Sequence, residues 1–285
     1  MKKSWIFAVV LLIPFFLFFA IFKLLPIIFT SYRSIFEIDG GEAVFIGVKN
    51  YSAFFQDSLF WKAAWNTFAI FIIYVFIKIP LIIIFGTIIS TLGKIKKVYL
   101  KLLYLPALVG MFAYAIIYRY LFSYDGAINS VLYFLFRFKI NWFGQSFAAQ
   151  SVVAFALLWS GFGIGLLMTI NAISTIPKSI FEYAQLEGAN LFVIIQKIII
   201  PYIIPVLRTI LFYSIIETIG LVDVPMNLTG GAPEQTTVTL GYYLYITAFD
   251  YWNFSYSAAI GIIMFIVIFV LSLLFTKRNL KDEIF

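Results

Sequence analysis

The sequence predicts an all-α, polytopic membrane protein with six transmembrane helices, and two observations carry this prediction. Of the 285 residues, 63% are hydrophobic and only 12% are charged, and the mean hydropathy is +1.02. A soluble core cannot absorb this much apolar surface. The apolar residues also gather in six runs, each long enough to cross the hydrocarbon core of a bilayer as a helix.

The six runs set the expected helices. They lie at about residues 5–30, 65–92, 102–122, 147–173, 198–222 and 256–275. The first follows Lys2 and Lys3 and resembles a secretory signal, but it is too long for the apolar region of one. We therefore expect a retained signal-anchor helix. Because no linker or internal repeat divides the chain, we expect a single transmembrane domain over residues 1–285.

Lysine and arginine predict the orientation. The loop at residues 93–101 holds four lysines and no acidic residue, and Lys277, Arg278 and Lys281 follow the last run. Residues 223–253 contain acidic residues but no lysine or arginine. Basic residues concentrate in cytoplasmic loops, so we expect both termini to be cytoplasmic. The formal charge of +7 then reflects membrane topology, and we expect membrane lipid but no nucleic acid as a partner.

Several kinds of chemistry are excluded by composition. The chain has no cysteine and no histidine, which rules out disulfides, thiolate or imidazole metal sites, and Ser-His or Cys-His catalysis. It contains no Gly-x-x-x-x-Gly-Lys-Ser/Thr phosphate loop. We therefore expect no catalytic residue, no metal site and no cofactor in this chain, and we do not expect it to hydrolyse ATP.

The segments between the runs show further local signals. Residues 31–62 are mixed, with many polar residues and the turn signal Gly40-Gly41, and we expect them outside the membrane. Residues 131–138 are expected as an amphipathic helix at the membrane interface. Gly161 and Gly165 lie one turn apart in the fourth run, which favours close helix packing. The surrounding Gly-Phe-Gly-Ile-Gly is not a dinucleotide-binding motif, because no strand precedes it.

The fifth run contains two ionisable residues, Arg208 and Glu217. Charged groups at membrane depth cost several kcal/mol unless they face protein or water, so this helix should line the interior of the helix bundle. Two interpretations stay open: the charges pair with neighbouring groups, or they form part of a pathway wall. The candidates for a translocation path are Asn66, Glu217 and Thr218.

The polar interval at residues 176–197 predicts a helix–Gly–helix elbow. Pro177 suits the first turn of a helix, Gly188 is a good terminator, and Asn190 can cap a second helix. Ile180, Ala184 and Gly188 recur at i, i+4 and i+8, a stripe of shrinking side chains that would let another protein approach closely. A plain connector between two membrane helices is the alternative interpretation.

The elbow resembles a known motif. Residues 182–184, EYA, are followed by three residues and then by GA at residues 188–189. This order is similar to the "EAA" loop, Glu-Ala-Ala-x-x-x-Gly-Ala, of bacterial ABC importer permeases. Two positions depart from that pattern: Tyr183 replaces the second small residue, and Glu187 stands where an aspartate is common.

A second region is similar to the sugar-type members of that family. Residues 228–233, LTGGAP, residues 236–239, TTVT, and residues 245–249, YITAF, resemble their "L-T-x-G-G-P … T-x-T-L … Y-x-x-A-F" region. Residues 45–51 resemble, more weakly, their "F-x-G-x-x-N-(Y/F)" stretch. Together the matches favour the carbohydrate-uptake branch, which is similar to maltose and glycerol-phosphate permeases.

The resemblance implies the permease, or transmembrane, subunit of a binding-protein-dependent ABC importer. It implies the type I ABC importer permease fold, a bacterial cell membrane (inner or plasma) location, and a sugar, oligosaccharide or polyol-type cargo. The implied partners are cytoplasmic ABC ATPase subunits that bind ATP and Mg, a second and related permease, and an extracellular or periplasmic solute-binding protein.

In that family the EAA loop forms a coupling helix seated in a cleft of the ATPase. The resemblance therefore places the ATPase contact at Glu182, Ala184, Glu187, Gly188 and Ala189, with Glu182 facing a basic group of the partner. A stand-alone secondary transporter or channel is the alternative. It would explain the intramembrane charges but would leave the elbow without a purpose, and a membrane enzyme is a third, less favoured class.

Overall fold

The structure is a computed structural model that describes residues 2–39, 42–92 and 96–282. The predicted Gly40-Gly41 turn and Lys94 of the basic loop lie outside these residues. Within them, five helices are long and apolar enough to cross a membrane: Leu11–Ile35, Ser58–Ser90, Ser146–Ser174, Leu191–Ile219 and Phe254–Phe275. A bent pair, Val98–Leu108 and Met111–Leu121, makes a sixth if it is counted as one span. The predicted all-α polytopic fold is confirmed, and the orientation of the termini stays a prediction.

The prediction of one continuous helix over residues 102–122 is wrong. This run is broken into α5 (Lys96–Tyr104), the 3-10 turn η3 (Leu105–Leu108) and α6 (Met111–Leu121), and the two halves meet at 93°. Pro106 lacks the amide hydrogen that a helix interior needs. Gly110 is extended, with φ −64° and ψ 144°, and caps α6. The sequence therefore carries two breakers that the uniform hydrophobicity of the run conceals.

The chain divides into two compact units, of which the first comprises Met1–Ser58 and Leu244–Val267. It begins with α1 (Lys2–Phe19), the π-helical segment η1 (Ala20–Leu24) and α2 (Leu25–Ile35). A two-stranded antiparallel sheet follows, β1 (Phe36–Asp39) and β2 (Glu42–Phe45), with α3 (Lys49–Ala53) after it. The sheet was not expected from the sequence, which indicated only a polar segment with a turn.

The residues of the "F-x-G-x-x-N-Y" stretch fold this first segment back on itself. Gly47 has a φ of +60°, a conformation that favours glycine. The Asn50 side chain then donates to the carbonyl oxygen of Ser34 at 3.0 Å, and the hydroxyls of Tyr51 and Ser34 lie 2.8 Å apart. In the same unit Tyr256 donates to Asp57 at 2.6 Å. The stretch therefore holds α3 against the end of α2 through hydrogen bonds.

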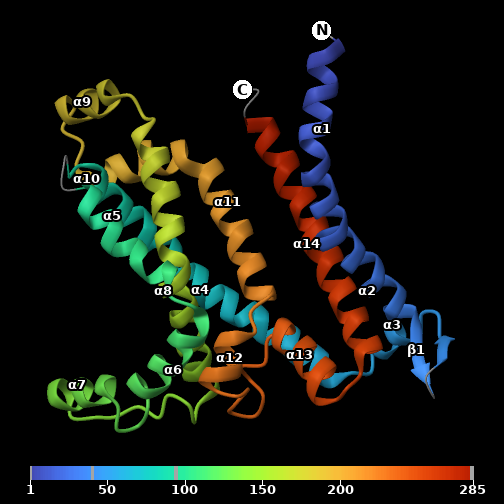
Figure 1. Ribbon diagram of the computed structural model, residues 1–285. Helices are drawn as coiled ribbons and strands as arrows, with labels where there is room; N and C mark the ends of the chain where they lie inside the picture. Colours follow the sequence, from blue (N-terminus) through green and yellow to red (C-terminus); the bar gives the residue numbers. More distant parts are fainter. Residues whose placement is uncertain (1, 40–41, 93–95, 283–285) are drawn as a thin grey trace. The chain divides into compact units, whose positions relative to one another are not determined.

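The second unit comprises Leu59–Tyr243 and Ile268–Phe285. Besides α5, η3 and α6, its elements are α4 (Ser58–Ser90), α7 (Ala127–Phe136), α8 (Ser146–Ser174), α9 (Lys178–Leu186), α10 (Leu191–Ile194), the π-helical η4 (Ile195–Ile199), α11 (Ile200–Ile219) and α12 (Asp223–Leu228). Three elements have residues in both units: α4 through its first residue, α13 (Leu240–Tyr245) and α14 (Phe254–Asp282). The π-helical η5 (Ile246–Asp250) belongs to the first unit. Figure 1 labels most of these elements.

Helix α8 is the centre of the second unit. It contacts α5, η3, α6, α11 and α12, and its side chains at Ala149, Val153, Ala154, Ala156 and Leu157 are fully buried. In a lipid bilayer the hydrophobic effect does not drive helices together. Small and aliphatic residues favour helix association because they let neighbouring helices pack closely. The crossing with α5 is close: a Cβ added at Gly163 would lie 2.9 Å from the carbonyl oxygen of Leu103.

The predicted interfacial helix at residues 131–138 corresponds to α7 (Ala127–Phe136). Its loop is held by Asn129, which is fully buried. The Asn129 amide donates to the carbonyl oxygens of Tyr124 at 3.0 Å and Ile140 at 2.8 Å. Its oxygen accepts from the backbone of Ile140 and from the indole of Trp142. A fully satisfied buried amide of this kind fixes a loop that has little other regular structure.

Candidate functional site

The predicted elbow is present and is built by a helix stop and a helix cap. Pro177 is the residue before α9, with φ −57° and ψ 134°, one position earlier than the first turn. At the other end Gly188 has a φ of +77° and donates to the carbonyl oxygen of Gln185 at 3.0 Å. Ala189 donates to that of Ala184 at 2.9 Å. This pair of bonds is the Schellman motif, which requires a left-handed residue that glycine supplies without strain.

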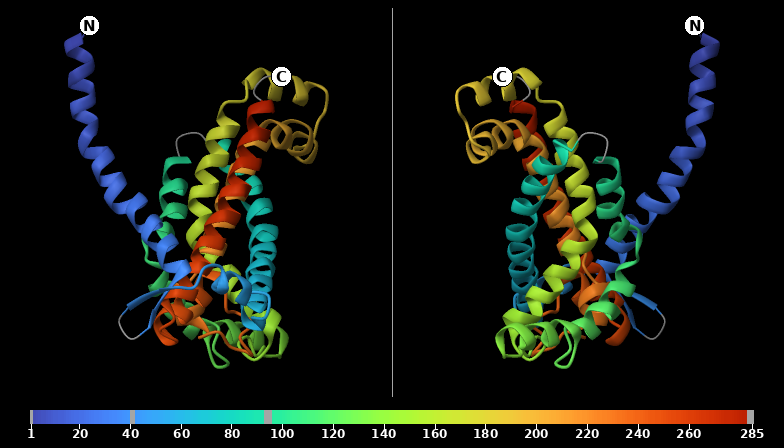
Figure 2. Two further views of the ribbon diagram at one scale, coloured as in Figure 1. Left: turned by 90° about the vertical axis from the view of Figure 1, so that its right-hand side faces the viewer. Right: turned by 90° about the vertical axis from the view of Figure 1, so that its left-hand side faces the viewer.

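Asn190 starts the second arm of the elbow. Its side chain accepts a hydrogen bond of 3.0 Å from the backbone amide of Val193, the geometry of an N-cap. From this cap α10 passes through the π-helical η4 into α11. The elbow thus joins α8 to α11, and it lies at the end of the second unit opposite α7 and α12 (Figure 1, Figure 2).

The outer face of α9 carries the predicted acidic residues. Glu182 and Glu187 are exposed, as is Gly188. Two apolar side chains accompany them, since Tyr183 is 71% and Leu186 83% exposed. Tyr183, which departs from the family pattern, therefore points away from the chain itself. A partner that binds this face must accommodate its ring.

The other predicted coupling residues face inward. Ala184 and Ala189 are half-buried and, together with Phe181, pack against the core formed by α4, α8 and α11. Their small side chains let the elbow lie close to that core. Their assignment to a partner contact stays a prediction, whereas their contact with the core ties α9 to the membrane helices.

A network of polar side chains joins α4 to α11 inside the second unit. The Lys78 ammonium, only 2% exposed, donates to the hydroxyl of Tyr74 at 2.6 Å, to Ser214 at 3.1 Å and to Oε2 of Glu217 at 3.3 Å. Tyr74 in turn donates to the same Oε2 at 2.7 Å. The Glu217 side chain keeps 28% of its surface exposed. We call Tyr74, Lys78, Ser214 and Glu217 the polar network.

The two glycines of α8 make room for this network. A Cβ added at Gly161 would lie 3.3 Å from both carboxylate oxygens of Glu217, and one at Gly165 would lie 3.3 Å from Cε of Lys78. The close packing predicted for these glycines is therefore present. Because these two residues have no side chain, the Lys78–Glu217 ion pair fits beside the backbone of α8. The sequence alone did not indicate this role.

A cavity of about 310 Å³ opens beside the polar network. It is lined by Lys78, Gly161, Ile164, Gly165, Met168, Ile210, Tyr213 and Glu217. Of the three path candidates, only Glu217 is among these lining residues. Thr218 is fully buried and donates to the carbonyl oxygen of Ser214 at 2.7 Å. The sequence missed Tyr213, although its position one turn before Glu217 places it on the same face.

Asn66 holds the turn at residues 229–239, which the charge pattern predicts to be external and which we call the external turn. It is almost fully buried and donates to the carbonyl oxygens of Gln235 at 2.8 Å and Val238 at 3.0 Å. Gln150 adds a bond of 2.8 Å to that of Thr236. These bonds fix residues 229–239, where Glu234 and Gln235 both have positive φ values. The "T-G-G-x-P … T-x-T" region is therefore a rigid turn clamped by α4 and α8.

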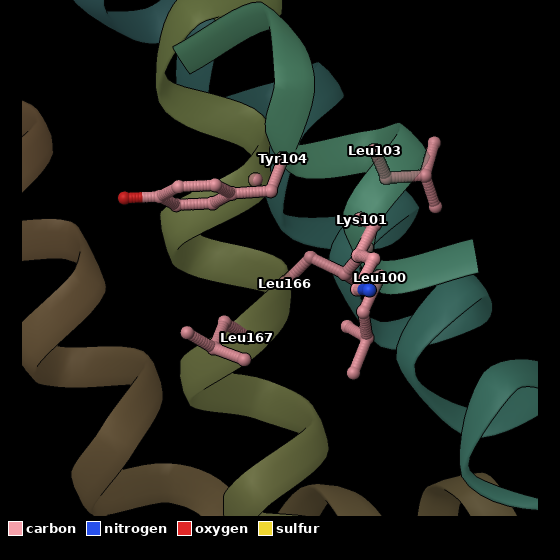
Figure 3. A pocket seen from close by; sticks show the side chains of 7 residues that line it. Leu100, Lys101, Leu103, Tyr104, Leu166 and Leu167 are labelled. Atoms are coloured by element: carbon pink, nitrogen blue, oxygen red, sulfur yellow. The ribbon is translucent and has the colours of Figure 1, made fainter. Parts of the chain in front are cut away.

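A second cavity, of about 210 Å³, lies between α5 and α8. Figure 3 shows its lining, in which the Tyr104 ring lies alongside α8 and Leu103 and Lys101 project from α5. Lys101 is the one charged residue among those that line it. The described residues also contain no group of three or more acidic side chains that could hold a metal ion. Neither feature adds chemistry to the polar network.

Known proteins are similar to the chain over almost its whole length. The permease protein AraP of the arabinooligosaccharide transport system of Bacillus subtilis is 32% identical over 272 residues, which cover 93% of this chain and 86% of AraP. SmoG, the sulfoquinovosyl glycerol transport system permease protein of Agrobacterium fabrum, is 28% identical over 86% of this chain and 80% of SmoG. LacF, the lactose transport system permease protein of Rhizobium radiobacter, is 28% identical over 90% of this chain and 88% of LacF.

A solved structure shares the fold. A chain of a bacterial ABC transporter involved in the import of the acidic polysaccharide alginate superposes with a TM-score of 0.81, covering 98% of this chain and 96% of that chain at 20% identity. No protein-family model matches the sequence. The extent and identity of the match to AraP confirm the resemblance seen in the elbow and the external turn: the chain belongs to the permease proteins of carbohydrate ABC transport systems.

Proposed function

We propose that this chain is the transmembrane permease subunit of a bacterial ABC importer and moves a carbohydrate into the cell. Relatives named for arabinooligosaccharide, lactose and sulfoquinovosyl glycerol transport support a carbohydrate cargo. The observation that carries the proposal is the exposed elbow around α9, in a chain of this family. The chain acts as one multi-pass transmembrane domain of the cell membrane and supplies the transport pathway, not an enzymatic activity.

ATP hydrolysis belongs to a partner. We propose that cytoplasmic ABC ATPase subunits bind ATP and Mg and receive α9 in a cleft. Glu182 and Glu187 on the outer face fit basic groups at the rim of that cleft, and charge-assisted bonds to carboxylates are among the stronger polar contacts. Tyr183 and Leu186 supply the exposed apolar surface that anchors protein interfaces.

The geometry of the elbow allows a movement of α9 to be transmitted to the membrane helices α8 and α11. The Schellman turn and the Asn190 cap make the two arms stiff, and Ala184 and Ala189 tie them to the core of the second unit. A displacement of α9 would therefore carry α8 and α11 with it, and these helices bear the cavity and Glu217. We propose that this is how closure of the ATPase drives alternating access, a rigid-body transition of packed helices.

The remaining partners follow from the family and from the external turn. We propose a second, related permease beside this one and a solute-binding protein outside the membrane. In this scheme Glu217 contacts the cargo path, whereas Asn66 and Thr218 act by holding neighbouring backbone. A related importer of this fold has been solved in complex with a periplasmic protein that holds an alginate pentasaccharide.

Co-purification tests the proposal. The tagged chain is isolated from its native membrane with and without the double change Glu182→Ala, Gly188→Arg. The matched control is Glu234→Ala, Gly230→Arg on the external turn, where Gly230 also has a positive φ, +61°, and open space around it. We expect the unmodified chain and the control to retain the ATPase, and the elbow variant to insert in the membrane but lose it. A chain that purifies without an ATPase, or an elbow variant that keeps one, would contradict the proposal.

A further inference from the structure

The cavity beside the polar network is lined by two polar side chains of α11, Tyr213 and Glu217. Tyr213 and Glu217 lie four residues apart and so share one face of the helix. Tyr213 lines the cavity and is 54% exposed. The cavity volume, about 310 Å³, lies at the lower end of the range of roughly 300–1,000 Å³ for small-molecule sites. It has room for a single small ring.

Lys78 carries the positive charge at this cavity, and its hydrogen-bond donors are all directed to other side chains of the protein. A lysine ammonium has three N–H donors, and those of Lys78 are directed to Tyr74, Ser214 and Glu217. Lys78 is also almost fully buried. No donor of this lysine is therefore left for a ligand, and its charge is balanced by the carboxylate beside it.

Glu217 keeps an acceptor for a ligand. Both hydrogen bonds to its carboxylate, from Tyr74 and from Lys78, end on Oε2. Among the hydrogen bonds of the described residues, none uses Oε1, and the side chain is 28% exposed. The cavity wall thus offers one carboxylate oxygen and one aromatic ring, and apart from Lys78 its remaining lining residues are glycines and apolar side chains.

This arrangement suits an uncharged polyhydroxyl ring. A sugar hydroxyl can donate to Oε1, and the apolar face of a sugar ring can lie against the ring of Tyr213. An acidic sugar would bring its own anion towards Glu217 with no free donor in the cavity to receive it, and such like-charge contacts strongly disfavour a ligand. The distinction matters because an importer of this fold takes up an acidic polysaccharide.

We propose that Tyr213 and Glu217 form a subsite for an uncharged sugar ring, and that this cavity selects neutral over acidic carbohydrates. The proposal rests on the importer function above and adds the charge class of the cargo. Lys78 and Tyr74 are positioning residues, because they hold the carboxylate through Oε2 and leave Oε1 able to accept a hydrogen bond.

Direct binding tests the selectivity without the solute-binding protein. The complete complex of this chain, its partner permease and the ATPase is placed in lipid nanodiscs. Equilibrium dialysis then measures saturable binding of two matched pairs, galactose with galacturonate and glucose with glucuronate. Each pair differs by the oxidation of one CH₂OH group to a carboxylate. We expect the neutral member of at least one pair to bind at least about tenfold more tightly than its acid, since a single uncompensated charge a few ångströms away is worth that factor or more.

Variants then locate the effect. Tyr213→Ala is expected to weaken binding of the neutral sugar about tenfold, whereas Tyr213→Phe keeps the ring and the binding. Tyr202→Ala, an exposed tyrosine of α11 about three turns away, is the matched control and leaves binding unchanged. Glu217→Gln keeps an acceptor oxygen but leaves the Lys78 charge unbalanced, so the neutral-to-acid preference should shift towards the acid by about tenfold. The tyrosine variants do not disturb the ion pair and stay informative if Glu217→Gln is poorly stable.

Three results would overturn the inference: equal or tighter binding of the acidic sugars, no binding of either class, or a Tyr213→Ala variant that binds as the unmodified chain does. ATP-dependent sugar uptake in cells, measured in parallel, separates this failure from that of the importer function. If uptake persists, the function stands and only the subsite is wrong. If no sugar is taken up with ATP, the importer function itself fails.

Discussion

Removing either charge of the Lys78–Glu217 pair is expected to destabilise the protein, and by unequal amounts. Glu217→Gln leaves the Lys78 ammonium, 2% exposed, without its counter-charge, and such a loss costs about 3–5 kcal/mol. Lys78→Met leaves a carboxylate that is 28% exposed and still accepts from Tyr74. That group can rehydrate, so we expect about 1.5–3 kcal/mol. The double variant removes both charges and should cost less than Glu217→Gln alone.

Thermal unfolding of the purified complex in detergent measures this order. For a chain of this length an unfolding entropy of about 2 cal/mol/K per residue converts the larger cost into a lower Tm by roughly 5–8 °C and the smaller into about half of that. A double-mutant cycle then gives the coupling of the two charges. The reasoning is refuted if Lys78→Met destabilises as much as Glu217→Gln, or if the two effects simply add in the double variant.

Three further changes test the supporting structure. Asn66→Ala leaves two backbone carbonyls of the external turn without their donor. This should lower the free energy of unfolding by about 1–3 kcal/mol and speed proteolysis within residues 229–239. Unchanged cleavage would show that Asn66 does not hold this turn. Gly163→Ala places a carbon 2.9 Å from the Leu103 carbonyl oxygen and should lower the Tm clearly more than Gly110→Ala, which has no atom within 4 Å. Asn190→Ala removes the cap of α10 at a cost of about 1 kcal/mol, whereas Asn190→Ser should keep most of the Tm.

The membrane helices could be predicted because hydrophobic length is a local property. The predicted spans at residues 147–173 and 256–275 fall inside α8 and α14, and the one at residues 198–222 corresponds to Leu191–Ile219. The break in the third run was missed because every residue around Pro106 and Gly110 is apolar. A hydropathy pattern cannot distinguish a continuous span from a bent one when the breakers lie within the same apolar run.

The elbow was predictable for a similar reason. Gly188 and Asn190 act through their own backbone and their immediate neighbours, so their types report the turn directly. The faces of α9 were less predictable. The stripe through Ala184 was interpreted as a surface for a partner. Ala184 is half-buried and packs against the core of its own chain, and its partner contact stays a prediction. Helical spacing shows which residues share a face and not which body covers it.

The polar network lies beyond what the sequence could reveal. Glu217 was recognised as costly in a membrane, yet its partner Lys78 lies 139 residues away in the sequence, and their pairing depends on how α4 and α11 cross. Asn66 illustrates the same limit: it was named as a candidate for the pathway, and the sequence did not indicate that its amide holds a turn at residues 235–238. Long-range pairing is set by tertiary packing, which composition and periodicity do not encode.

Reconstituted transport tests the central claim most directly. The chain, its partner permease, the ATPase and the solute-binding protein are assembled in proteoliposomes, and sugar uptake is measured with ATP or with a non-hydrolysable analogue. The importer account predicts uptake that requires both ATP and the binding protein, and that is lost in the Glu182→Ala, Gly188→Arg variant while the two permeases remain assembled. Sugar movement through this chain alone, without the ATPase, would contradict it and would identify a stand-alone transporter or channel.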